Sequence, residues 1–173
     1  MNHSSLHSNI WKYYLLQIAV ALTFFFTEIV TLYYLHFGLT YTQISLVVAS
    51  SLIASLLFEI PSGAFADLYG RKKSLMISAV FLAVSIALFS FSSSFFVFIF
   101  ASFLYGIGIS FSSGAGDALF YDTLKKLRKE KDFLKYRSVQ EALYLCVALF
   151  SAFLSPYLFS LNVRLPYYIS AVS

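Results

Sequence analysis

Residues 59–75 read EIPSGAFADLYGRKKSL and join two long apolar segments of the chain. Charge is concentrated in this stretch, whereas the segments on either side of it contain almost none. Gly63 is expected to let another helix approach closely, and Gly70 suits the left-handed turn that ends a helix, so a new helix is predicted to begin directly after it. Three cations, Arg71, Lys72 and Lys73, then open that helix at the end where the helix dipole disfavours positive charge. A compensating anion is expected nearby: Asp67, another carboxylate or lipid phosphate.

The composition of the chain excludes a water-soluble domain. Of its 173 residues, 60% are hydrophobic, 20% are aromatic and only 12% are charged. A soluble domain carries about 25% charged residues. The formal net charge of +4 is therefore no sign of a nucleic-acid partner, and none is expected. The single cysteine, Cys146, lies within an apolar run and is interpreted as a small buried hydrophobe.

Five apolar segments are long enough to cross ~30 Å of hydrocarbon at ~1.5 Å per residue. The predicted helices run from Trp11 to about Leu35, from Gln43 to Leu68, from Lys72 or Ser74 to Phe91, from Phe95 to Thr123, and from Lys135 to Phe159. Residues 1–10 are predicted to form a polar tail, and Pro166 to Ser173 to begin a sixth helix. The predicted fold class is an all-α integral membrane protein with five transmembrane helices plus the start of a sixth.

The junction quoted above resembles the loop signature of the major facilitator superfamily (MFS), which lies between the second and third membrane helices of that fold. The signature residues stand in the expected order: Gly63, Asp67, Gly70, Arg71 and Lys72. The preceding Glu59-x-Pro61-x-Gly63 is similar to a variant found in bacterial members. Hydropathy extends the resemblance over one half of the fold. It implies that residues 11–173 form the N-terminal helical bundle of a transporter, incomplete because the chain stops within its sixth helix.

Ionisable side chains inside membrane segments are costly and are candidates for function. Four acids fall there, on the first, second, fourth and fifth predicted helices: Glu28, Glu59, Asp117 and Glu141. In the family these four helices line the central cavity, so the resemblance implies a substrate or proton site. For Glu59, Asp117 and Glu141, a structural ion pair or hydrogen bond is favoured over contact with the substrate. Glu28 is the best candidate because it lies deeper and has no obvious partner in its own helix.

A second group of charges is expected to control conformation. Asp122, at the end of the fourth predicted helix, matches the acidic position that the family pairs with the loop arginine. The resemblance therefore implies a charge latch of Asp67, Arg71 and Asp122 that holds an outward-open state.

The fourth predicted helix carries small residues at intervals of four: Ser102, Gly106, Ser110, Gly114 and Ala118. Such a stripe favours close packing between membrane helices over a ligand-binding groove. Gly106 and Gly108 also fall where the family's fourth-helix motif has glycines. That motif's arginine would align with Ser102, and the fifth helix lacks the Gly-Pro-Gly-Gly pattern of antiporters. Both departures weaken an assignment to drug–proton antiport.

The leading interpretation is secondary active transport of a small solute across the cell membrane by alternating access. One alternative is a non-transporting remnant, or a half-protein that needs a separately encoded C-terminal half or a second copy. A membrane-embedded enzyme is less favoured, because His36 is the only histidine outside the tail and lies at the outer edge. The expected partners are the lipid bilayer and a small-molecule substrate, with no cofactor or metal.

The distribution of Lys and Arg predicts the orientation of the chain. Eleven of the twelve lie at position 12, at 71–73 or within 125–137, and only Arg164 falls in a loop on the opposite side. The positive-inside rule then places the N-terminus and both basic loops in the cytoplasm of a multi-pass protein.

Single-cysteine labelling in a Cys146→Ser background tests this orientation. In intact cells, a membrane-impermeant thiol reagent is expected to label Ser93→Cys, since residues 38–42, 92–94 and 161–165 are predicted to face outward. Lys129→Cys is expected to react only after the membrane is opened. If Lys129→Cys is labelled and Ser93→Cys is protected in intact cells, the predicted orientation is wrong.

Overall fold

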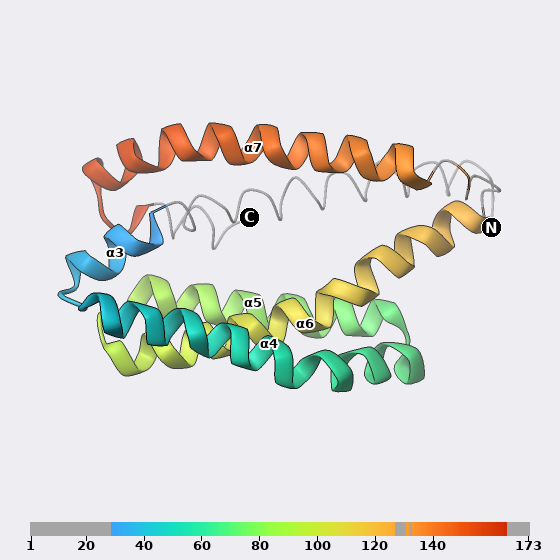
Figure 1. Ribbon diagram of the computed structural model, residues 1–173, viewed down its shortest axis with the longest axis horizontal. Coiled ribbons are helices and arrows are strands. Elements are labelled where there is room, and N and C mark those ends of the chain that lie inside the picture. Colours follow the sequence, from blue (N-terminus) through green and yellow to red (C-terminus); the bar gives the residue numbers. More distant parts are fainter. Residues whose placement is uncertain (1–28, 127–130, 132, 166–173) are drawn as a thin grey trace. The chain divides into compact units, whose positions relative to one another are not determined.

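The computed structural model describes residues 29–126, 131 and 133–165. Its helices are α3 (Val30–His36), α4 (Tyr41–Tyr69), α5 (Arg71–Phe91), α6 (Phe95–Lys126) and α7 (Phe133–Leu161) (Figure 1). The described part of the chain contains no strand. Four segments are long and apolar enough to cross a membrane: α4, α5, α6 as far as Asp122, and α7. The all-helical class is therefore confirmed for these residues, and the chain is a multi-pass membrane protein.

Two of the predicted helices fall largely outside this range. Only the end of the first predicted helix is described, as α3, and the sixth helix predicted from Pro166 lies beyond the last described residue. The polar tail is likewise outside it. The count of five helices plus the start of a sixth therefore stays a prediction.

The start of α4 lies two residues earlier than predicted, at Tyr41, because a capping box precedes it. The backbone N–H of Gln43 donates to the side-chain oxygen of Thr40 at 3.3 Å, and the backbone N–H of Thr40 donates to Gln43 Oε1 at 2.9 Å. This reciprocal arrangement satisfies backbone donors at the start of a helix. Thr40-x-x-Gln43 is a recognisable signal in the sequence that the hydropathy pattern alone does not reveal.

The junction between α4 and α5 consists of Gly70 alone. Its φ of 97° and ψ of 142° lie in a region where L-residues are strained. The N–H of Gly70 donates to the carbonyl of Ala66 at 3.0 Å, and the N–H of Lys73 donates back to the carbonyl of Gly70 at 3.1 Å. The helix boundary predicted at Gly70 is therefore confirmed with a positive φ, although its ψ lies outside the left-handed helical region, and α5 begins with the three cations as expected.

The chain divides into two compact units. One unit comprises residues 29–117, which contain α3, α4, α5 and α6 as far as Asp117. The other includes the described residues from Ala118 onward, which contain the end of α6 and all of α7.

Two glycines of α6 allow close packing in the unit formed by residues 29–117. A Cβ atom at Gly106 would lie 2.9 Å from the Cβ of Ala54 on α4, and closer still to the backbone oxygen of Ser51. A Cβ atom at Gly108 would lie 2.8 Å from the Cγ of Leu82 on α5. Helix α6 therefore contacts α4 through one glycine and α5 through the other (Figure 1).

Serine hydroxyls link these three helices through backbone carbonyls. Eight serine hydroxyls donate between helices over 2.7 to 3.1 Å: Ser50 to Ile99, Ser55 to Gly106, Ser62 to Ser110, Ser74 to Phe111, Ser78 to Gly108, Ser85 to Ala101, Ser102 to Val47, and Ser110 to Ser55. Every one of these bonds has α6 as donor or acceptor. Hydrogen bonds between membrane helices contribute about 0.6 kcal/mol each on average. The predicted small-residue packing is confirmed for Ser102, Gly106 and Ser110.

An aromatic cluster fastens α3 to the same unit. The hydroxyl of Tyr33 donates to the carbonyl of Phe89 at 2.8 Å, and both side chains are buried. The rings of Tyr34 and Phe98 lie 5.1 Å apart between centroids, and those of Phe89 and Phe98 lie 6.0 Å apart. These contacts join the end of the first predicted helix to α5 and α6.

The interpretation of Cys146 as a buried hydrophobe is wrong, because its side chain is exposed. The buried residues of α7 are Gln140, Ser151 and Ser155. At 100° per residue, Cys146 lies on nearly the opposite face of the helix from Ser155. In an apolar membrane helix almost every position is hydrophobic, so hydrophobicity does not reveal which face is covered.

We expect Gly106→Ala to destabilise the unit, because the added methyl group would overlap the backbone of α4 and force the helices apart. Overpacking of this kind costs about 1–3 kcal/mol. The melting temperature of the purified chain in detergent, followed by circular dichroism at 222 nm, should fall by several degrees.

Gly116→Ala is the matched control, since nothing lies within 4 Å of the Cβ position at Gly116. It should leave the melting temperature unchanged or raise it slightly through better helix propensity. Equal melting temperatures for the two variants would contradict the close contact at Gly106.

Candidate functional site

Glu59 lies on the face of α4 that is not packed in the unit formed by residues 29–117. Its side chain is exposed, and its neighbours Leu56 and Ile60 are 73% and 83% exposed. The packed face lies at Ser62, whose hydroxyl donates to the carbonyl of Glu59 at 3.1 Å and to that of Ser110 at 3.0 Å. Within the described part of the chain, no cation forms an ion pair with Glu59. Its carboxylate therefore contributes nothing to the packing of α4 on α6.

Glu141 forms a structural ion pair, as favoured for this residue. The Nη2 atom of Arg137 lies 3.2 Å from Glu141 Oε1, one helical turn away on α7. The Nη1 atom of Arg137 also donates to Gln140 Oε1 at 3.2 Å. Both charged side chains are partly exposed, at 35% and 52%. The spacing of four residues between Arg137 and Glu141 is the sequence signal for this pair.

The remaining acids are not all placed by the structure. Glu28 and the side chain of Asp117 lie outside the described part of the chain. Glu59 and Glu141 belong to different units, each with its own packing. The grouping of the four acids in one site therefore stays a prediction.

The signature residues occupy the end of α4 and the start of α5. Asp67 is exposed in the last turn of α4, and Arg71 is half-buried as the first residue of α5. Asp122, half-buried near the end of α6, belongs to the other unit. The charge latch of these three residues stays a prediction.

The expectation that Gly63 admits a close neighbour does not hold among the described residues. Gly63 is exposed, and nothing lies within 4 Å of the position of its Cβ. The reason is its position on the helix, since Ser62 holds the packed face of α4 against α6. The close approach occurs instead at Gly106 and Gly108 of α6.

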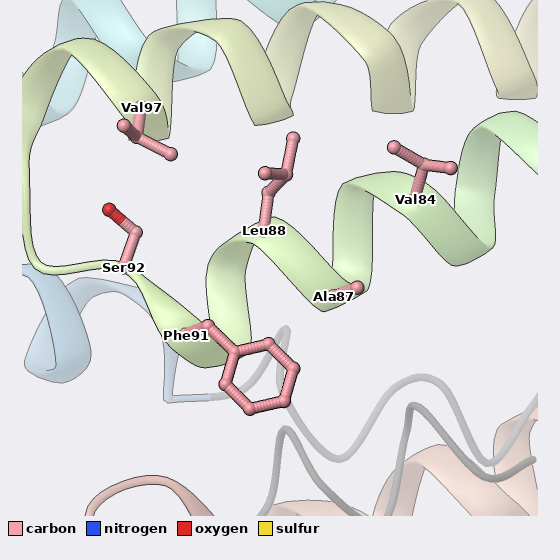
Figure 2. Close-up of a pocket in the computed structure, with 6 residues that line it drawn as sticks. All are labelled: Val84, Ala87, Leu88, Phe91, Ser92 and Val97. Carbon is pink, nitrogen blue, oxygen red and sulfur yellow. The ribbon is translucent and has the colours of Figure 1, made fainter.

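A pocket of about 410 Å³ lies at the turn between α5 and α6, at the opposite end of α5 from Arg71. Its lining is apolar apart from one hydroxyl: Val84, Ala87, Leu88, Phe91, Ser92 and Val97. Figure 2 shows Leu88 and Val97 extending from the two helices toward the same space. None of the four membrane acids lines this pocket, so it is not part of the site predicted from them. Among the described residues, no three His, Cys, Asp or Glu side chains are grouped to hold a metal ion.

Comparison with known proteins identifies the family. The sequence profile described as Major Facilitator Superfamily matches residues 13–173. The chain is also 32% identical over 142 residues to the "Uncharacterized MFS-type transporter YxaM" of Bacillus subtilis (strain 168), which covers 82% of this chain. The match takes in 35% of that relative, so the chain spans about a third of its length. The family profile matches nearly the whole length of the chain, the junction of α4 and α5 carries the signature residues, and four of the described helices are apolar enough to cross a membrane. The chain therefore belongs to the major facilitator superfamily.

Proposed function

We propose that this chain supplies the N-terminal membrane helices of a secondary transporter that moves a small solute across the cell membrane by alternating access. In such transporters one bundle of helices rocks against another around a central site. The described helices then belong to one of the two bundles, and transport requires the other bundle as well. The observation that carries the proposal is the close packing of α4, α5 and α6 into one unit within a family of transporters.

Rigid-body motion requires a bundle whose helices do not slide past one another. The glycine contacts of α6 and the eight serine-to-carbonyl bonds supply that stiffness for residues 29–117. None of these contacts uses a charged side chain. These contacts therefore do not depend on the membrane acids, which leaves those acids available for binding.

Glu28, Glu59 and Asp117 are the proposed substrate or proton sites. A carboxylate in a membrane segment is energetically costly, so its presence there indicates that it binds a cation or carries a proton. The exposed carboxylate of Glu59 supports this assignment, because no cation among the described residues pairs with it. Glu141 is a weaker candidate, since Arg137 already pairs with it.

Reconstitution in liposomes with a panel of small solutes tests the proposal. The chain is used alone and co-expressed with the part of the Bacillus subtilis relative that follows the matched region. We expect saturable uptake only for the combination, because alternating access needs two bundles. Glu28→Gln and Glu59→Gln should each lower that uptake at least tenfold.

The matched control is Glu130→Gln, which removes a carboxylate from the loop before α7 and should leave uptake unchanged. Saturable uptake by the chain alone, lost on Glu28→Gln, would contradict the requirement for a second half. Uptake that all three substitutions lower equally would contradict the proposed sites.

The charge latch is the second part of the proposal. Arg71 is half-buried at the start of a helix, where the dipole disfavours a cation, so a carboxylate partner would stabilise it. Arg71→Asp and Asp122→Arg should each lower the melting temperature of the purified chain. The double variant should recover part of the loss, with a coupling of about 0.5–3 kcal/mol.

Lys72→Asp combined with Asp122→Arg is the matched control for the latch. Lys72 is the adjacent cation and is exposed, so this combination should show no recovery. If the effects of Arg71→Asp and Asp122→Arg simply add, the two side chains are not in contact.

A further inference from the structure

The end of α6 and the start of α7 are held together by aromatic side chains. The rings of Phe120 and Phe133 lie 6.0 Å apart between centroids, those of Phe120 and Tyr136 6.2 Å, and those of Tyr121 and Phe133 5.7 Å. Phe120 is only 2% exposed, whereas Tyr121 is 42% exposed. The cluster fixes the spacing of the two helix ends on either side of the loop between them.

Exposed cations flank this cluster along the chain. Lys125 follows Tyr121 by one turn of α6, Lys131 precedes Phe133, and Lys135 lies in the first turn of α7. All three lysines are exposed, and no carboxylate among the described residues pairs with them. We call these three lysines and Leu134 the basic turn.

Leu134 gives the basic turn an apolar component. Its side chain is 75% exposed although it lies between Phe133, which packs in the aromatic cluster, and Lys135. A leucine presented among lysines is costly in water and favourable where hydrocarbon begins. Tyr121 provides the amphipathic ring that membrane interfaces favour.

The lysines of the basic turn lie at the ends of two helices that are long and apolar enough to cross a membrane. The candidate span in α6 ends at Asp122 and that in α7 begins at Phe133, so Lys125 and Lys131 lie just outside the two spans and Lys135 lies in the first turn of the second. The three lysines therefore fall at the edge of the hydrocarbon, where the phosphate groups of phospholipids are found. Soluble acidic ligands would have no use for the exposed leucine.

We propose that the basic turn binds the headgroup of an anionic phospholipid. Lys125, Lys131 and Lys135 contact the phosphate, and Leu134 and Tyr121 contact the first part of the acyl chains. The carboxylates closest in sequence, Glu130 and Asp132, reduce the local charge but leave a positive excess, since residues 125–137 hold seven basic residues and two acidic ones. The proposal depends on membrane insertion alone and is independent of transport.

The test reconstitutes the purified chain in nanodiscs of equal parts phosphatidylglycerol and phosphatidylcholine. After extraction in mild detergent, mass spectrometry measures the ratio of the two lipids that stay bound. We expect an excess of phosphatidylglycerol that falls as the salt concentration rises. In Lys131→Gln/Lys135→Gln the excess should fall about fivefold for each lysine, the equivalent of about 1 kcal/mol.

Lys12→Gln/Arg164→Gln is the matched control, because it removes the same charge at positions outside residues 125–137. It should keep the excess of phosphatidylglycerol. An equal fall in both double variants would show that net charge alone sets the preference and would overturn the proposal. No excess in the unmodified chain would overturn it as well.

Two further measurements separate the lipid from other ligands and from misfolding. Leu134→Gln keeps every charge and should halve the excess or more, with helix content unchanged by circular dichroism. Glycerol phosphate at millimolar concentration should not displace the lipid, since it has no acyl chains. Displacement by glycerol phosphate, or no effect of Leu134→Gln, would assign the basic turn to soluble phosphate and refute lipid binding.

Discussion

The structure of this chain depends on the approach of α6 to its neighbours at Gly106 and Gly108. Burial of apolar surface does not drive helices together in a bilayer, because lipid tails are as apolar as leucine. Association must come from van der Waals contact and hydrogen bonds, and both require short distances between backbones. The absent side chains at the two glycines bring α6 close enough to α4 and α5 for serine hydroxyls to reach carbonyls across the interface.

These hydrogen bonds use backbone carbonyls as acceptors, which determines which side chains the packing of the bundle requires. A carbonyl is present at every position, so a serine needs no specific partner side chain on the facing helix. Charged residues are then not needed for assembly. Glu59 stands exposed on α4 while Ser62, three residues later, is buried and bonded to α6. Packing and the proposed chemistry thus occupy different faces of one helix.

Much of the fold follows from local signals in the sequence. Gly70, the polar residues at 92–94 and the long apolar runs predict the ends of α4, α5 and α6 well. The small-residue stripe of α6 predicts its packing, because small side chains in lipid have few other uses. The sequence does not reveal which face of a uniformly apolar helix is covered, so the interpretation of Cys146 as buried is wrong. The partners of the membrane acids are equally hidden, except where spacing within one helix suggests them, as for Arg137 and Glu141.

The single-residue junction at Gly70 also fixes the rotational phase of α5 relative to α4. One inserted residue would turn α5 by about 100° about its axis. The hydroxyls of Ser74, Ser78 and Ser85 would then point away from α6, although the composition of the helix would be unchanged. An insertion elsewhere in a surface loop changes little, whereas here the length of the connection is as much a part of the interface as the serines themselves.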